Sequence, residues 1–379
     1  MDKRVFRKIS YKHFKKNLVY GVLFSLRIFF GVLFCAAGIY ICIFTAKNGS
    51  DLFYYALAFA SPGNAIEFLQ DPPLEEKPET EKPVFENKDE ISAPEDPEEQ
   101  IVFEIPEIES QIPKNRKGKV TETKYSASEG GLYVAFENAM IKNCTHHSTE
   151  KIKKMLETKH DLSLDFDSEN PQILLYHTHA TEGYEKSDSG IFDMAGTWRS
   201  TDPDENMISV GDVITCVLSE KGIGVIHDGT MHDDPSYTGS YQRSAVTISE
   251  HLDQNPEIKI CLDIHRDAIE PSSSEIIKPT AVINGKKAAQ IMIISGCDDG
   301  TMNMPDYWEN LRFAAALASK MEELYPGLCR PILFDYRKYN MDLSPGLLLI
   351  EIGATGNTLE EAKYSAELFA NALAELFTE

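Results

Sequence analysis

Beyond about residue 121, hydrophobic positions occur in short runs that alternate with longer stretches of helical spacing. The short runs predict β-strands near residues 173–177, 223–227, 258–265, 279–284, 290–295 and 346–351. Apolar residues three and four positions apart predict helices near residues 148–158, 204–221, 241–254, 306–324 and 358–377. This alternation predicts an α/β fold with a mostly parallel sheet and helices on both of its faces.

Three local patterns add detail to these elements. Asp202 has the residue type of a helix N-cap, with Glu205 as its capping-box partner. Thr358 and Glu361 repeat that pattern at the start of the last helix. The Asn-Gly pair at 284–285 predicts a tight hairpin turn between the strands on either side.

The amino-terminal part predicts a membrane anchor. Residues 1–17 are rich in lysine and arginine, and an apolar stretch follows over residues 18–46. Its last 19 residues carry no charge, and as a helix they would span about 28 Å, close to the thickness of a bilayer core. The basic flank predicts a cytoplasmic tail over 1–17, a single transmembrane helix over 18–46 and an extracytoplasmic remainder. A cleaved signal peptide is the alternative, but this stretch is longer than the apolar region of most signals.

A linker separates this anchor from the folded part. After a juxtamembrane segment at 47–70, residues 71–113 contain 15 acidic residues and eight prolines. Such a composition predicts disorder, so residues 71–120 are interpreted as a linker and residues 121–379 as the catalytic domain. The formal net charge of −23 argues against a nucleic-acid partner. An anchor followed by a spacer indicates a substrate fixed outside the cell, such as a wall.

Candidate chemistry gathers where predicted strands end. His177 and His179 follow the first strand, Asp263 and His265 end another, and Glu351 ends the last. The carboxyl ends of parallel strands meet at one edge of a sheet, so these side chains are expected to converge. Two histidines and a glutamate are the ligand types of a catalytic zinc site, and a further carboxylate beside it can act as general base. Asp263 shares a strand face with His265 and is expected to orient its ring.

Several assignments stay open at this point. In an extended segment His177 and His179 face the same side, so either can bind a metal. The third ligand is Glu205 or Glu182, although the capping pattern already explains Glu205. Arg266 is a candidate for binding an anionic group of the substrate. Arg243 and Tyr241 are candidates for binding polar glycan or peptide groups.

Five ordered motifs together resemble one known family, the stage II sporulation protein P family of endospore-forming bacteria. They are HTHATEGY, GIGVIHDGTMHDDPSYTGSYQRS, DIHRDA, YNMDLSPGLLLIE and GATGNTLEEA, within residues 170–377. That family is similar to the zinc N-acetylmuramoyl-L-alanine amidases. The resemblance implies a zinc amidase-like fold and an amidase with associated endopeptidase activity, acting on peptidoglycan during engulfment.

The resemblance also implies roles for individual residues. The first zinc histidine falls on His179, with His177 as its neighbour, and the second falls on His265. The catalytic acid falls on Glu351. The glutamate ligand falls on Glu205, with Glu182 as the alternative.

Partners and location are implied in the same way. The expected partners are stage II sporulation proteins D and M, and the expected location is the membrane of the sporulation septum. A hypothesis from a different class is a non-catalytic, wall-binding scaffold subunit of a membrane complex. A second enzymatic hypothesis is another metallohydrolase, such as a peptidase or a sugar deacetylase.

Overall fold

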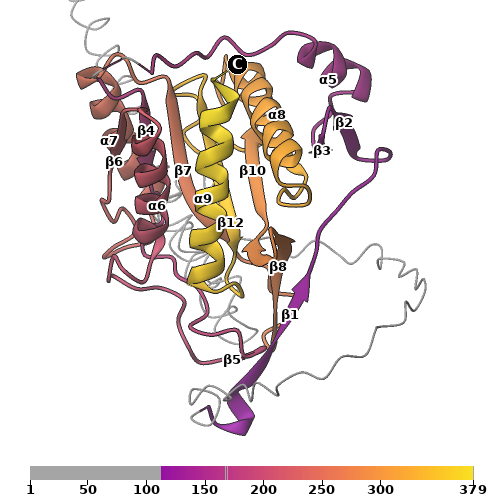
Figure 1. Ribbon diagram of the computed structural model, residues 1–379, viewed down its shortest axis with the longest axis vertical. Coiled ribbons are helices and arrows are strands. Elements are labelled where there is room, and N and C mark those ends of the chain that lie inside the picture. The colour runs from indigo at the N-terminus through magenta and orange to yellow at the C-terminus, as the bar shows by residue number, and fades with distance from the viewer. Residues whose placement is uncertain (1–111, 167, 169, 379) are drawn as a thin grey trace, which may run out of the picture. The chain divides into compact units, whose positions relative to one another are not determined.

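The computed structural model describes residues 112–166, 168 and 170–378, which form a mixed α/β fold with two sheets (Figure 1). The helices are η1 (Lys114–Arg116), α5 (Thr149–Leu156), α6 (Met207–Glu220), α7 (Ser240–Gln254), α8 (Tyr307–Leu324) and α9 (Leu359–Leu376). The strands are β1 (Lys117–Thr123), β2 (Tyr133–Phe136), β3 (Ala139–Asn143), β4 (Ile173–Tyr176), β5 (Ile191–Asp193), β6 (Val225–His227), β7 (Ile260–Asp267), β8 (Glu275–Ile283), β9 (Lys286–Ala289), β10 (Ile291–Gly296), β11 (Ile332–Asp335) and β12 (Leu347–Ala354).

The predicted basic tail, transmembrane helix and juxtamembrane segment lie outside the described residues, as does most of the predicted linker. Within the part of the chain that the structure describes, no helix is both long and apolar enough to cross a bilayer. The predicted linker extends to residue 120, but β1 already begins at Lys117. The folded part therefore starts slightly earlier than predicted.

The main sheet has eight strands in the order β2-β3-β11-β10-β12-β7-β4-β6. The β2–β3 and β10–β12 pairs are antiparallel, and the remaining neighbours run parallel. This order confirms the prediction of a mostly parallel sheet. It also puts β12, β7 and β4 side by side, so the carboxyl ends of these three strands share one edge.

Each face of the main sheet has its own hydrophobic core. Alternating residues of the central strands, such as Ile264 and Ile350, pack into the core beneath α6, α8 and α9. Helix α9 packs against both α6 and α8, and the three lie on the same side of the sheet (Figure 1). The intervening residues, such as Cys261 and Leu349, pack into a second core with Ile248 of α7. Helices therefore cover both faces, as predicted.

A second sheet, in the order β5-β1-β8-β9, was not predicted. The Asn284-Gly285 turn is confirmed, because both residues have positive φ angles (51° and 77°) and the turn joins antiparallel strands. Its partner strand is β9, however, and β10 leaves to join the main sheet. The chain changes sheets at Gln290, whose side-chain amide donates to the carbonyls of Tyr125 and Gly327 (2.9 Å each).

The predicted start of α6 was wrong. The helix begins at Met207, and its N-cap is Asn206, whose side chain accepts a hydrogen bond from the backbone N–H of Ile208 (2.9 Å). Asp202 instead accepts from the N–H of Asp204 in a local turn (3.0 Å). The capping box of α9, formed by Thr358 and Glu361, is confirmed.

Candidate active site

The candidate site lies where the sheet edge meets the face covered by α7. In β7, Asp263 and His265 follow Cys261 at every second position and therefore share its face. In β12, Glu351 follows Leu349 in the same way. His265 and Glu351 are partners in the parallel register of β7 and β12. The sheet itself brings these side chains together, as predicted for the strand ends.

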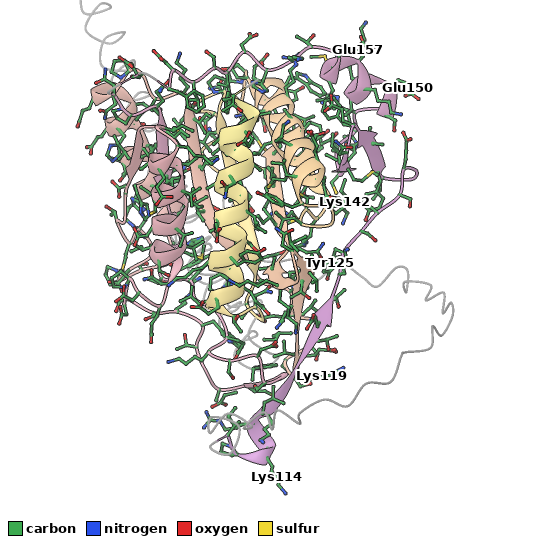
Figure 2. All side chains as sticks on the ribbon, in the orientation of Figure 1. Lys114, Lys119, Tyr125, Lys142, Glu150 and Glu157 are labelled. Carbon is green, nitrogen blue, oxygen red and sulfur yellow. The ribbon has the colours of Figure 1, made fainter. Side chains whose placement is uncertain are left out.

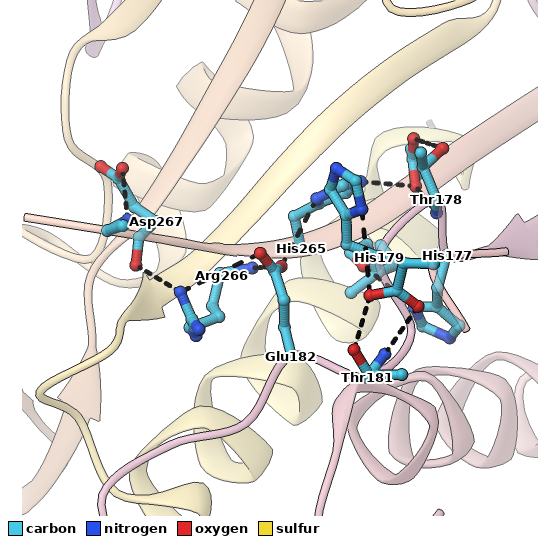
Figure 3. Close-up of polar contacts among 12 residues, drawn as sticks. His177, Thr178, His179, Thr181, Glu182, His265, Arg266 and Asp267 are labelled. Carbon is cyan, nitrogen blue, oxygen red and sulfur yellow. Dashed lines mark hydrogen bonds and ion pairs between the residues drawn. The ribbon is translucent and has the colours of Figure 1, made fainter. Parts of the chain in front are cut away.

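His179 reaches the same place from the segment after β4 (Figure 3). Its buried ring lies 5.3 Å from that of His265, edge to face, and the ring of Tyr237 stacks on it at 4.3 Å. Its Nδ1 lies 3.9 Å from Oδ2 of Asp233. Burial lowers the pKa of His179 to about 4. The imidazole is therefore neutral near pH 7 and keeps a lone pair for a proton or a metal ion.

His265 lies between two carboxylates. Its Nε2 is 2.8 Å from Oδ1 of Asp263, and its Nδ1 is 3.5 Å from Oε2 of Glu182. Burial works against a charged ring, but the two carboxylates outweigh it and raise the pKa of His265 well above its ordinary value. The two carboxylates therefore favour a positive charge at this position. The predicted contact between Asp263 and His265 is present.

Glu182 is buried and held by positive groups on several sides. Its Oε2 accepts from the backbone N–H of Arg266 (3.4 Å), and its Oε1 lies 3.7 Å from Nη2 of Arg199. Burial favours the protonated acid, but Arg266 and His265 outweigh it and lower the pKa of Glu182 below its ordinary value. Glu182 is therefore an anion that faces His265.

Glu351 has the opposite electrostatic environment. Burial, reinforced by the carboxylate of Asp267, raises the pKa of Glu351 to about 8. Its Oε2 is buried without a hydrogen-bond partner. Its register partner, His265, has a buried Nε2 that forms an ion pair with Oδ1 of Asp263 (2.8 Å) without hydrogen-bond geometry. Buried polar atoms without partners are rare in folded proteins. The partnerless Oε2 of Glu351, beside His265, indicates a place where a ligand, a water molecule or an ion completes the site.

The donor set fits zinc in kind. His179 and His265 supply imidazole nitrogens, and Glu182 supplies a carboxylate. The 3.5 Å between Nδ1 of His265 and Oε2 of Glu182 is close to the roughly 3.4 Å between two ligands of a tetrahedral zinc ion. In residues 112–166, 168 and 170–378, no three histidine, cysteine or acidic side chains are placed to hold an ion as they stand. Completing a coordination sphere would require a side chain to move.

His177 does not share the site with His179, because the chain does not stay extended after β4. Residues 178–181 form a turn, in which the N–H of Glu182 donates to the carbonyl of His179 (3.2 Å). The ring of His177 is fully buried, with Nδ1 2.9 Å from the carbonyl oxygen of Ile264 and Nε2 2.8 Å from Nε2 of His227. Both of its nitrogens are engaged, so the alternative metal ligand His177 is not supported.

The His177–His227 pair depends on Gly211 in α6. A methyl group at Gly211 would lie 2.5 Å from Nε2 of His227 and 2.9 Å from Nε2 of His177. We expect Gly211→Ala to lower the free energy of unfolding by about 1–3 kcal/mol, because overpacking forces the two rings apart. Urea unfolding measures this. Gly229→Ala is the matched control, since its methyl group would meet the side chain of Ile208 at ordinary contact distances (3.6 Å and beyond); equal losses in both variants would contradict the prediction.

Glu205, predicted as the third metal ligand, lies apart from this arrangement. Its side chain is exposed, accepts from the hydroxyl of Ser200 (3.1 Å) and lies 3.9 Å from Nζ of Lys186. Glu182, the alternative, is the acid that contacts His265. The predicted start of α6 would have put Glu205 inside the helix, whereas the helix begins at Met207 and leaves Glu205 in the preceding turn.

Two of the three predicted substrate-binding residues hold loops in place. Arg266 is buried, and its Nε donates to the carbonyl of Gly183 (2.7 Å). The guanidinium of Arg243 donates to backbone carbonyls of residues 232–238. Tyr241 does lie at the site, with its ring 5.6 Å from that of His179.

Asp233 and Arg199 also lie at the site, although neither was predicted as a site residue. Asp233 falls within the motif GIGVIHDGTMHDDPSYTGSYQRS, and Arg199 falls in none of the five motifs. Asp233 is buried and accepts from the hydroxyl of Thr181 (2.6 Å) and from Nη1 of Arg199 (2.6 Å). The Arg199 guanidinium also lies over the ring of Tyr237 (5.0 Å), which covers His179. Their positions depend on the folding of two loops, so no spacing rule could have identified them.

Fold and site together define a mixed α/β protein whose histidines and carboxylates meet at the carboxyl edge of its main sheet. A family model described as stage II sporulation protein P matches residues 71–374. The chain therefore belongs to the stage II sporulation protein P family. It is similar to stage II sporulation protein P of Bacillus subtilis (strain 168), with 30% identity over 222 residues. This match covers 54% of the chain and 51% of that relative, so the chain spans about half of the relative's length.

Solved structures with some likeness are N-acetylmuramyl-L-alanine amidases. The apo form of Ami1 from Mycobacterium abscessus aligns with a TM-score of 0.32 and 13% identity, over 55% of this chain and 97% of that one. The CwlD amidase from Clostridioides difficile, solved in complex with the GerS lipoprotein, aligns with a TM-score of 0.33 and 10% identity, over 54% and 94%. With TM-scores this low, the likeness supports no conclusion about the fold or the function of this chain.

Proposed function

We propose that this protein is a zinc-dependent peptidoglycan hydrolase, an N-acetylmuramoyl-L-alanine amidase with associated endopeptidase activity. Membership of the stage II sporulation protein P family supports a role in degrading the septal wall during engulfment. The observation that carries the chemistry is the buried, partnerless Oε2 of Glu351, whose register partner is His265, with Glu182 and His179 close by.

The metal would be held by His179, His265 and Glu182. A bound zinc ion supplies Lewis acidity toward the substrate carbonyl and acidifies water near it. Two of the donors suit this task as they stand, because His179 is neutral and Glu182 is ionised. His265, whose pKa is raised, would lose a ring proton when it binds the metal. Asp263 would orient His265 through its 2.8 Å contact.

Glu351 is the group placed to move the proton. In its ionised form, it accepts the proton of the attacking water and returns it to the amine that leaves when the bond between muramic acid and L-alanine breaks. Its raised pKa suits this exchange, because a catalytic base works best with a pKa near the working pH. A cation bound beside it would lower that pKa.

The cellular setting is part of the same proposal. Residues 18–46 would anchor the chain in the membrane of the sporulation septum, and stage II sporulation proteins D and M would be its partners. Residues 71–113, with 15 acidic residues, would carry the folded part away from the membrane to its substrate.

Digestion of purified sacculi tests the function. The full-length protein should release stem peptides that begin with a free L-alanine, leaving intact muramic acid on the glycan. A chelator should abolish this release, and added zinc should restore it, because the bond is broken at a metal-dependent site. Mass spectrometry of the products identifies the bond that breaks.

Other results would replace the proposal. Sacculi that bind the protein without being digested would favour the scaffold hypothesis. Products cut only within the peptide, or glycan that has lost only acetyl groups, would indicate a peptidase or a sugar deacetylase instead. Circular dichroism of the chelated protein checks that loss of release does not reflect unfolding.

A further inference from the structure

A cavity of about 480 Å³ opens beside the candidate active site. Its walls are residues 183–186, residues 197–200, Glu205 and the start of α9 at residues 358–360. This volume falls within the range of small-ligand sites, roughly 300–1,000 Å³. The catalytic roles proposed above do not use it.

The cavity is continuous with the site through two paired segments. Glu182 and Arg199 face each other in a β-bridge, and the next residue, Gly183, donates its N–H to the carbonyl of Trp198 (2.7 Å). Arg199 lines the cavity, and its side chain contacts Glu182 and Asp233. A molecule seated in the cavity therefore lies beside Gly183 and Arg199, the chain neighbour and the bridge partner of Glu182.

Some of the charged groups in the walls already have strong partners. Arg199 is bound to Asp233, and the carboxylate of Glu185 accepts from the indole N–H of Trp198. These groups shape the cavity, and they are poorly suited to exchange their partners for a ligand.

Lys186 and Glu205 differ from them. Their side chains are 77% and 53% exposed, with Nζ and Oε1 3.9 Å apart. An exposed ion pair of this kind contributes little free energy, so both groups can turn to a ligand at small cost. Glu360 places a further exposed carboxylate in the wall. One cation beside two carboxylates matches a ligand that carries both an ammonium and a carboxylate group, and it disfavours a purely anionic one.

We propose that this cavity is a subsite for the peptide part of the substrate and recognises a zwitterionic side chain, as in a diamino-dicarboxylic acid. Lys186 pairs with the carboxylate of that side chain, and Glu205 pairs with its ammonium. The assignment rests on the proposed function, because the amide that breaks is the one that joins this peptide to the glycan.

Calorimetric titration of the full-length protein with free stem tetrapeptides tests the subsite. One peptide carries diaminopimelate at its third position, and the other carries lysine, which lacks the second carboxylate. Lys186→Gln should weaken binding of the diaminopimelate peptide about two- to fivefold and leave the lysine peptide unchanged, because a single exposed ion pair is lost. Glu205→Gln should weaken binding of both peptides by a similar factor, because both carry the ammonium.

Lys153→Gln is the matched control. Lys153 forms an exposed ion pair with Glu129 and lies on α5. In Figure 2 the labels of Glu150 and Glu157 mark α5, far from the label of Lys114, and Figure 1 shows β5 near that lower end. This variant should bind both peptides as the wild type does. Equal affinities for the two peptides in every protein, or no binding at millimolar peptide, would overturn the proposal.

The outcome separates from that of the sacculus assay. The free tetrapeptides lack the bond to muramic acid, so they report binding without turnover. If the peptide affinities follow the predicted pattern but the sacculi are not digested, the subsite stands and the amidase activity is rejected. If the sacculi are digested but Lys186→Gln and Glu205→Gln bind both tetrapeptides as the wild type does, the amidase activity stands and the subsite is rejected.

Discussion

His265→Ala should reduce release of stem peptides from sacculi by more than about a hundredfold. Replacing a partner that merely orients a metal ligand typically costs about 10–100-fold, and a ligand itself should cost at least as much. His265 also lies between Asp263 and Glu182, so its removal leaves two carboxylates without the positive charge between them. Bound zinc, measured after dialysis, should fall together with the rate.

His251→Ala is the matched control. His251 also pairs with an aspartate, Nε2 to Oδ2 of Asp228 at 2.8 Å, but it lies on α7 outside the candidate site. This variant should keep both its zinc and its rate. Wild-type release by His265→Ala, with the fold intact by circular dichroism, would remove His265 from the mechanism.

Glu351→Gln should lose about 10²- to 10⁴-fold in rate while zinc binding persists, because general base catalysis typically contributes that much. Glutamine keeps the shape of the side chain but cannot take up the proton of water. Glu309→Gln is the control, since Glu309 also has a buried carboxylate oxygen without a hydrogen-bond partner but lies on α8. A Glu351→Gln enzyme as active as the Glu309→Gln enzyme would exclude Glu351 as the base.

The same variant should gain stability at alkaline pH in the metal-free protein. In the folded chain burial raises the pKa of Glu351 to about 8, whereas the unfolded value is about 4.3. The folded state thus favours the protonated acid, and the free energy of unfolding should fall as pH rises from about 4.3 through 8. Glu351→Gln removes this part of the pH dependence and should be more stable than the wild type above pH 8, by about 1–3 kcal/mol, the usual cost of an unsatisfied buried group. Thermal melts of both proteins from pH 5 to 9 measure the effect, and parallel curves would contradict it.

The sequence by itself determined the elements that form the frame of the site. Alternation along β7 placed Asp263 and His265 on one face, because side chains of a strand point to opposite faces in turn. The register that makes His265 and Glu351 neighbours was not local, because it depends on the parallel pairing of β7 with β12. The capping box of α9 was local, since Thr358 and Glu361 are three residues apart. The shared face in β7 and the capping box of α9 each depend on spacing along a single element.

Only the tertiary structure decided which residues complete the site. An extended chain would give His177 and His179 the same face, but a turn after β4 sends His177 into the core against His227 and leaves His179 beside His265. That Glu182 and not Glu205 contacts His265 depends on the true start of α6 and on a loop that folds back over β7. These outcomes rest on contacts between segments far apart in the chain, whose free energies no local pattern contains.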